Sequence, residues 1–147
     1  MISKILVPSD GSKTSQKAAE YAINLAKQLK ASIIALSIID KRSFITQTMP
    51  ETARRTIEPI EDYLREAAEE YAGAIKKLCD KSGVASKIFI KMGHPVEEIV
   101  KQAKRSKVNL IVMGSRGRSA LSATILGSVS YGVIHKNTSI PILIVRD

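Results

Sequence analysis

The sequence predicts an α/β fold, a single doubly wound, five-stranded parallel sheet of order 3-2-1-4-5 with helices on both faces. Short apolar runs alternate along the chain with longer segments whose apolar residues recur at helical spacing, which favours repeated strand–helix units. The apolar runs are nearly continuous, as in parallel strands that are covered on both faces. In such a sheet the first strand lies centrally, and the chain order reverses beside it.

The first strand and the first helix are separated by clear turn chemistry. Residues 2–7 are an apolar run that stops at Pro8, and residues 9–12 (Ser-Asp-Gly-Ser) suit a turn and a helix N-cap. Alanine and leucine then recur at helical spacing as far as Leu29, and residues 31–39 form a second strand rich in isoleucine.

The middle of the chain contains its one long irregular stretch. Residues 40–56 are polar, include Pro50 and show no period, so we expect no regular element there. The helical period is strong from about residue 59 to residue 81. Residues 85–92 follow as a third strand, with Ile88 and Ile90 on one side and Phe89 on the other.

The last third of the chain predicts two further strand–helix steps. Pro95 suits the first position of a helix, where its missing N–H costs nothing. Residues 108–113 predict a fourth strand, residues 127–136 the last helix and residues 140–145 the fifth strand.

Length and composition indicate one cytoplasmic domain spanning residues 1–147. The composition is that of an ordinary globular protein, with 44% apolar and 25% charged residues. The apolar runs are too short to span a bilayer, and residues 1–7 lack a hydrophobic signal region. Cys79 is the single cysteine, so no internal disulfide is possible, and we expect it to be a small buried apolar side chain.

The net charge of +9 is concentrated near the C-terminus. Residues 99–146 contain eight Lys or Arg and no Asp or Glu, whereas residues 51–98 contain ten acids and eight bases. Part of this excess is solvated lysine on helix faces, while Arg116 and Arg118 fit the attraction of phosphate. Nucleic-acid binding would rest on charge alone, because no Arg- and Asn-rich recognition helix and no aromatic stacking motif occurs.

The loop after the fourth predicted strand contains a glycine- and serine-rich pattern that suits the binding of phosphate. It reads Gly114-Ser115-Arg116-Gly117, then nine residues, then Gly127-Ser128-Val129-Ser130. Glycine lets a phosphate approach the main chain closely, and the free N–H groups of a helix N-terminus attract anions. A plain strand–helix connection with a serine cap explains the same residues, and the pattern is neither a Walker loop nor Gly-x-Gly-x-x-Gly.

Topology points to the same place. Ligands of doubly wound sheets bind where the loops after the two strands at the point of reversal separate. In this chain those loops are residues 8–12 and 114–127, which are also the segments richest in small and turn-forming residues.

Taken together, these motifs make the chain resemble the universal stress proteins over essentially its whole length. The resemblance rests on Ile5-Leu6-Val7-Pro8, Asp10-Gly11-Ser12, Gly93-His94-Pro95, Met113-Gly114-x-x-Gly117-x9-Gly127-Ser128-Val129-Ser130 and Pro141-Ile142-Leu143-Ile144-Val145. The glycine spacing is similar to the ATP-binding signature of that family. It implies ATP as the ligand, with Mg²⁺ or Mn²⁺ as the candidate metal.

The resemblance also implies roles for individual residues. Pro8 and Asp10 would border the nucleoside, with Asp10 near the ribose or the metal, and Ile38 would pack on the adenine. Met113 and Gly114 would line the base and ribose. The residues implied around the phosphates are Arg116, Gly117, Gly127, Ser128, Val129 and Ser130.

The same residues favour binding of a nucleotide without its rapid hydrolysis. Fast phosphoryl transfer needs metal-binding carboxylates and a group that orients the attacking water. No carboxylate occurs in residues 108–136, and Asp10 and Asp40 are the acids expected nearby. The first hypothesis is therefore an ATP-bound switch or sensor of the stress response with at most slow hydrolysis. A slow ATPase and an interaction protein without nucleotide remain as alternatives.

The last strand predicts a homodimer. The stretch Ile140-Pro141-Ile142-Leu143-Ile144-Val145 would be an apolar edge strand, and exposed edges of this kind are usually covered. A second copy of the strand, antiparallel across a two-fold axis, is the simplest cover, and the family resemblance implies the same dimer. The alternative is an edge that is merely solvated.

Overall fold

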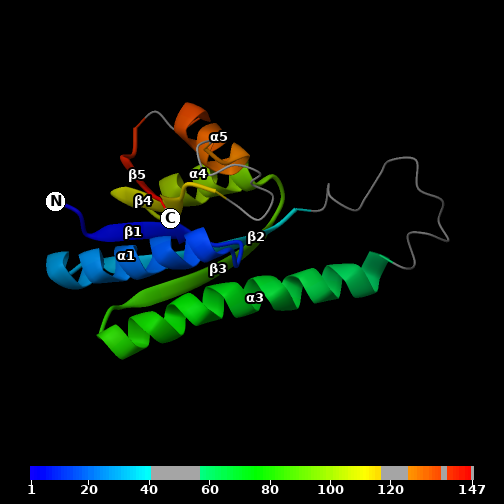
Figure 1. Cartoon of the computed structure of the whole chain (residues 1–147), viewed down its shortest axis with the longest axis horizontal. Coiled ribbons are helices and arrows are strands. Elements are labelled where there is room, and N and C mark those ends of the chain that lie inside the picture. The colour runs from blue at the N-terminus through cyan, green and yellow to red at the C-terminus, as the bar shows by residue number, and fades with distance from the viewer. Residues whose placement is uncertain (41–56, 117–125, 137–138, 147) are drawn as a thin grey trace.

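The computed structural model describes residues 1–40, 57–116, 126–136 and 139–146, which form one sheet with helices on both sides (Figure 1). The elements in chain order are β1 (Lys4–Pro8), α1 (Lys13–Leu29), β2 (Ser32–Ile39), α3 (Ile57–Ser82), β3 (Ser86–Met92), α4 (Pro95–Arg105), β4 (Leu110–Gly114), α5 (Ser128–Lys136) and β5 (Ile142–Val145). The stretch expected to be irregular lies, apart from Asp40, outside the described residues.

The sheet is parallel throughout, and its order is β3-β2-β1-β4-β5, which confirms the predicted fold class. The central strand is β1, where Leu6 is in register with Ile34 of β2 and Ile111 of β4. At one edge, β5 pairs through Leu143 with Val112 of β4. The order reverses between β1 and β4, so the two loops predicted to form the site leave from neighbouring strands.

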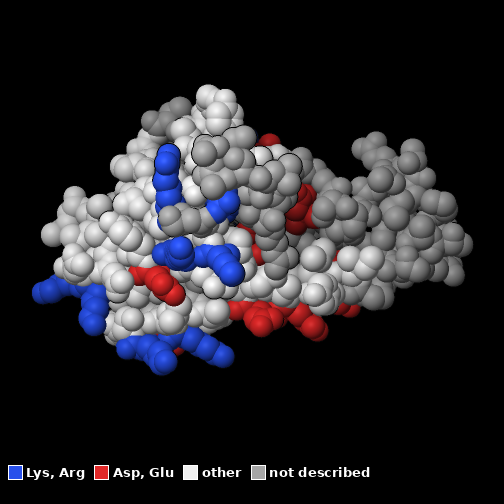
Figure 2. Space-filling model, in the orientation of Figure 1, with Lys and Arg blue, Asp and Glu red and all other residues white. Residues whose placement is uncertain are grey.

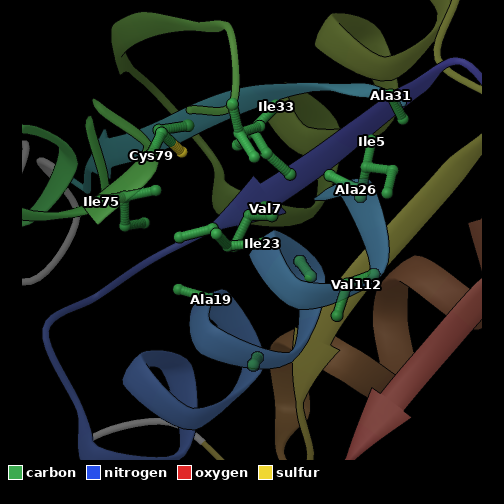
Figure 3. Close-up of a cluster of buried hydrophobic side chains, with 14 of the residues drawn as sticks. Ile5, Val7, Ala19, Ile23, Ala26, Ala31, Ile33, Ile75, Cys79 and Val112 are labelled. Carbon is green, nitrogen blue, oxygen red and sulfur yellow. The ribbon is translucent and has the colours of Figure 1, made fainter. Parts of the chain in front are cut away.

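Two hydrophobic clusters cover the two faces of the sheet. Alternate residues of β1 supply them: Ile5 and Val7 pack beneath α1 and α3, whereas Leu6 packs beneath α4 and α5. Figure 3 shows the first cluster, in which Ile23 of α1 and Ile75 of α3 meet the strands. As predicted for β3, Ile88 and Ile90 face the first cluster and Phe89 the second.

Cys79 lies inside the first cluster with no solvent exposure. Burial raises the pKa of its thiol, which disfavours the reactive thiolate. Cys79 is therefore the small buried apolar side chain that the sequence predicted.

The helix ends follow local chemistry that the sequence shows only in part. The side chain of Ser12 caps α1 by accepting a hydrogen bond from the N–H of Ser15. The chain leaves α1 at Lys30 and turns again after α4 at Lys107, which have left-handed φ values of 56° and 55°. These are positions where glycine is usual.

Two strands, β4 and β5, begin later in the chain than the sequence predicts. The N–H of Val108 donates to the carbonyl of Ala103 and so completes the end of α4, and β4 begins at Leu110 instead of residue 108. Similarly β5 begins at Ile142, so Ile140 and Pro141 lie outside the strand. None of the helices within the described residues has the length and apolarity needed to cross a membrane.

Candidate functional site

The loop after β1 is held in shape by short-range hydrogen bonds. Asp10 Oδ1 accepts a hydrogen bond from the N–H of Ser12 (2.9 Å), and Ser9 Oγ accepts one from the N–H of Gly11 (3.3 Å). The carbonyl of Ser9 also accepts the hydroxyl of Ser37, at 3.0 Å. These bonds leave the side chain of Asp10 exposed at the carboxyl end of the central strand.

The first turn of α1 packs directly on the end of β4. A Cβ atom on Gly114 would lie 2.8 Å from the backbone carbonyl carbon of Thr14, so only glycine allows this approach. The hydroxyl of Thr14, which is buried, donates to the carbonyl oxygen of Arg116. The two loops predicted to converge are thus joined through Thr14.

The start of α5 is tied to the same end of β4. The N–H of Gly127 donates to the carbonyl of Ser115 (2.6 Å), and the buried hydroxyl of Ser130 donates to the carbonyl of Gly114 (2.8 Å). The first N–H groups of a helix have no acceptor within the helix and lie at its positive end. Ser128, Val129 and Ser130 supply these groups, and such a terminus can hold an anion.

The hydrogen bond from Ser130 to Gly114 changes which group of Ser130 could contact a phosphate. Its hydroxyl hydrogen is used within the protein, so its backbone N–H is the group left to face a phosphate. Ser128 is exposed. Arg116 is half-buried beside them at the end of β4.

The predicted nucleoside residues lie at neighbouring strand ends. Pro8 ends β1 and is in register with Leu36 of β2. Ile38, two positions further along β2, is half-buried against the second cluster, in which Met113 is fully packed. The side chain of Met113 therefore supports the site from inside the core. Gly117 lies outside the described residues.

The family resemblance implies Asp10 as the candidate metal ligand. Within the part of the chain that the structure describes, no group of three or more His, Cys, Asp or Glu side chains is arranged to hold a metal ion. A Mg²⁺ ion at Asp10 would share its coordination with oxygens of the nucleotide or of water, as Mg²⁺ commonly does.

Sequence reasoning missed two residues that shape this site. Thr14 gave a weak signal, because it is a polar residue on the face of α1 that the apolar period places inward. Tyr71 lies within residues 59–81, for which the sequence predicts only a helix, yet a Cβ on Gly11 would lie 2.4 Å from the Tyr71 ring. Nothing in the local sequence pattern indicates that contact.

Comparisons with known proteins identify the family to which the chain belongs. The family model described as "Universal stress protein family" matches residues 1–146. Universal stress protein MJ0531 of Methanocaldococcus jannaschii is 38% identical over 143 residues, which cover 97% of this chain and 81% of that protein. The chain therefore belongs to the universal stress protein family.

Solved structures show the same architecture. The structure of MJ0577, a universal stress protein of Methanocaldococcus jannaschii, matches with a TM-score of 0.85 at 33% identity and covers 100% of this chain and 97% of its own. A universal stress protein in complex with cAMP matches with a TM-score of 0.68 at 22% identity, covering 99% of this chain and 97% of its own.

Proposed function

We propose that this protein binds ATP at the carboxyl ends of β1 and β4 and acts in the stress response as a nucleotide-dependent switch or sensor, with at most slow hydrolysis. The observation that carries the proposal is the anchoring of the α5 N-terminus to β4 by Gly127 and Ser130. This anchoring aims N–H groups that have no acceptor within the helix, together with the positive end of the helix, at the point where the strand order reverses.

The proposed phosphate site combines backbone donors with one cation. The N–H groups of Ser128, Val129 and Ser130, the close approach allowed by Gly127, and the guanidinium of Arg116 would surround the phosphates, together with Gly117. Helix N-termini and arginine both suit phosphate, because each offers donors to oxygens that carry negative charge.

The proposed nucleoside site lies on the other side of the reversal point. Pro8 and Asp10 would border the ribose, Ile38 would contact the adenine, and Met113 and Gly114 would form the floor. Asp10 is the residue that would share a Mg²⁺ or Mn²⁺ ion with the phosphates. The exposed carboxylate fits that role, because it lies at the carboxyl end of the central strand.

The cAMP complex of a family member is consistent with an adenine nucleotide in this fold. At 22% identity that likeness speaks to the fold alone, so the proposal for this chain rests on its own loops. We propose further that residues 1–147 act as one nucleotide-binding domain in the cytoplasm, where the buried Cys79 would stay reduced.

The first prediction separates phosphate from nucleoside contacts. Arg116→Ala is expected to weaken ATP binding by about 1–3 kcal/mol, because a partly buried charge-assisted hydrogen bond to phosphate is lost. Adenosine carries no phosphate, so its affinity should hardly change. Calorimetric titration of both ligands into both proteins tests this, and an equal loss for ATP and adenosine would contradict the assignment of Arg116.

We also propose a homodimer through the edge strand, comprising the stretch Ile140, Pro141, Ile142, Leu143, Ile144 and Val145. The carbonyls of Pro141 and Val145 accept hydrogen bonds from Ile111 and Ser115 on the β4 side. Because the backbone alternates in a strand, the N–H and C=O groups of Ile142 and Ile144 face the open edge. A second copy would pair with these groups across a two-fold axis.

The second prediction uses that alternation. Ile144→Pro removes one edge-facing N–H and leaves the bonds to β4 in place, so the folded variant should lose pairing through the edge strand, and its mass should fall by a factor of about two. Replacement by lysine is less suitable, because Leu143 and Ile144 pack on the two clusters of the core. Sedimentation at micromolar concentration measures the state. An unmodified protein that is already monomeric, or a proline variant with the same mass as the unmodified protein, would contradict the edge interface.

A further inference from the structure

Helix α3 carries two apolar stripes, and only one of them is buried in the core. Ala72, Ile75 and Cys79 pack in the first cluster beneath the sheet, and Ala68 on the same side of the helix is also buried. A second stripe with alternating spacings of four and three residues runs beside it, and consists of Ile60, Leu64, Ala67, Tyr71, Ala74 and Leu78. This spacing is that of a helix–helix seam.

The first part of this second stripe projects away from the body of the protein. No residue between 60 and 67 is buried, and Ile60 is 44% exposed. Figure 1 shows the corresponding part of α3 extending past the sheet. From residue 60 onwards, burial on α3 begins at Ala68, so residues 60–67 form an overhang whose apolar side chains are exposed at Ile60 and half-buried at Leu64 and Ala67.

The other part of the stripe lines a groove. A groove of about 760 Å³ runs between α1 and the C-terminal half of α3. Its walls include Gln16 and Ala19 from α1 and Tyr71, Ala74 and Leu78 from α3. Leu78 is 40% exposed there. One molecule therefore has both an amphipathic helical overhang and a groove of the kind that receives such a helix.

Charge along α3 is divided between its two halves. Five acids and one arginine occupy residues 61–70, whereas three lysines and one aspartate occupy residues 76–81. Figure 2 shows this division, with blue side chains towards the C-terminal end of α3 and red ones nearer its middle. A parallel neighbour would oppose like charges, whereas an antiparallel copy brings the acidic half beside the basic half.

We propose that the groove of one molecule receives the α3 overhang of a second copy, reciprocally and antiparallel across a two-fold axis. A two-fold axis through the middle of the stripe then places each inner residue of one copy opposite an inner residue of the other copy. At these inner positions a large side chain faces an alanine. The facing pairs are Ile60 with Leu78, Leu64 with Ala74, and Ala67 with Tyr71. Each pair occurs twice, so the contact is isologous and closed.

The central positions of this contact are its least favourable part. Glu69 and Glu70 of the two copies come near each other at the axis. Both side chains are exposed, so solvent and salt screen their repulsion. The apolar pairs at the two ends and the acid–lysine neighbours therefore determine the contact. This interface is separate from the edge strand.

Disulfide cross-linking tests the arrangement and its direction. In the double variant Ile60→Cys/Leu78→Cys, the two positions of one chain are roughly 27 Å apart along the helix, too far for an internal bond. Between antiparallel copies they face each other, so mild oxidation should give a covalent dimer on a non-reducing gel. Each single variant should give none by itself, whereas a mixture of the two singles should give the mixed dimer.

Other outcomes overturn the proposal. Cross-linking of Ile60→Cys with itself would mean a parallel contact, and no cross-linking by the double variant would mean no contact at all. The native Cys79 has no solvent exposure and should not interfere.

Sedimentation gives a second, independent measurement. Ile60→Lys places a charge on the overhang without touching the core and should lower the weight-average mass by a factor of about two, as for any closed two-fold contact. Ile134→Lys is the matched control, because Ile134 on α5 is 43% exposed and lies outside the groove. An Ile60→Lys protein with the same mass as the Ile134→Lys protein would refute the contact.

Discussion

Gly127→Val is expected to abolish ATP binding while the fold remains intact. Gly127 lies immediately before α5, and its N–H is fixed on Ser115 at 2.6 Å, so its α-carbon borders the proposed phosphate position. A branched side chain there would displace the phosphates from the helix N-terminus. We expect at least a hundredfold loss of affinity, or about 2.7 kcal/mol, by calorimetry.

The fold should tolerate this change because Gly127 is not among the positive-φ glycines of the described chain, which are Gly11, Gly83 and Gly93. Loss of a favourable capping residue should cost about 1 kcal/mol. Gly73→Val is the control, since a Cβ on Gly73 has no neighbour within 4 Å and α3 is remote from the phosphate site. Unchanged ATP affinity in Gly127→Val would show that the phosphates lie elsewhere.

The fold was predictable because its signals are repeated along the chain. Near-continuous apolar strands alternate with periodic helices, and parallel sheets of this kind have few possible orders. Element ends were less predictable, because Lys30 and Lys107 adopt left-handed conformations that usually require glycine. Since lysine carries no such signal, the extra turn that moves the start of β4 from residue 108 to Leu110 is invisible in the sequence.

The location of the candidate site was predictable from the sequence, whereas the contacts within it were not. The reversal between β1 and β4 follows from topology, and it brings the loops of Asp10 and Arg116 together as expected. The bonds that join them cross long sequence distances, for example between Thr14 and Arg116 or Ser130 and Gly114. No local period or motif specifies which hydroxyl meets which carbonyl, so these partners emerge only from the packed structure.

The same limit applies to Tyr71, which links α3 to the loop after β1. Gly11 has a φ of +79°, and a Cβ there would lie 2.4 to 2.7 Å from three atoms of the Tyr71 ring. The loop that presents Asp10 therefore depends on a residue of the helix that also lines the groove. Substitution at Gly11 should consequently affect both stability and nucleotide binding.

Gly11→Ala is expected to lower the free energy of unfolding by about 2–5 kcal/mol. The left-handed conformation costs an alanine about 1–2 kcal/mol, and the overlap with the Tyr71 ring adds about 1–3 kcal/mol. Gly83→Ala isolates the first term, because Gly83 has a φ of +69° and no neighbour within 4 Å of a Cβ. Denaturant unfolding of the two variants therefore measures the ring contact as their difference.

A double-mutant cycle with Tyr71→Ala then assigns that difference to the ring. Removing the ring costs stability by itself, but it also removes the atoms that an alanine at position 11 would overlap. The cost of Gly11→Ala should therefore fall to that of Gly83→Ala in the Tyr71→Ala background, as coupled neighbours behave. Equal costs for Gly11→Ala and Gly83→Ala in the unmodified protein would show that the loop yields to the ring, and that Tyr71 does not hold Asp10 in place.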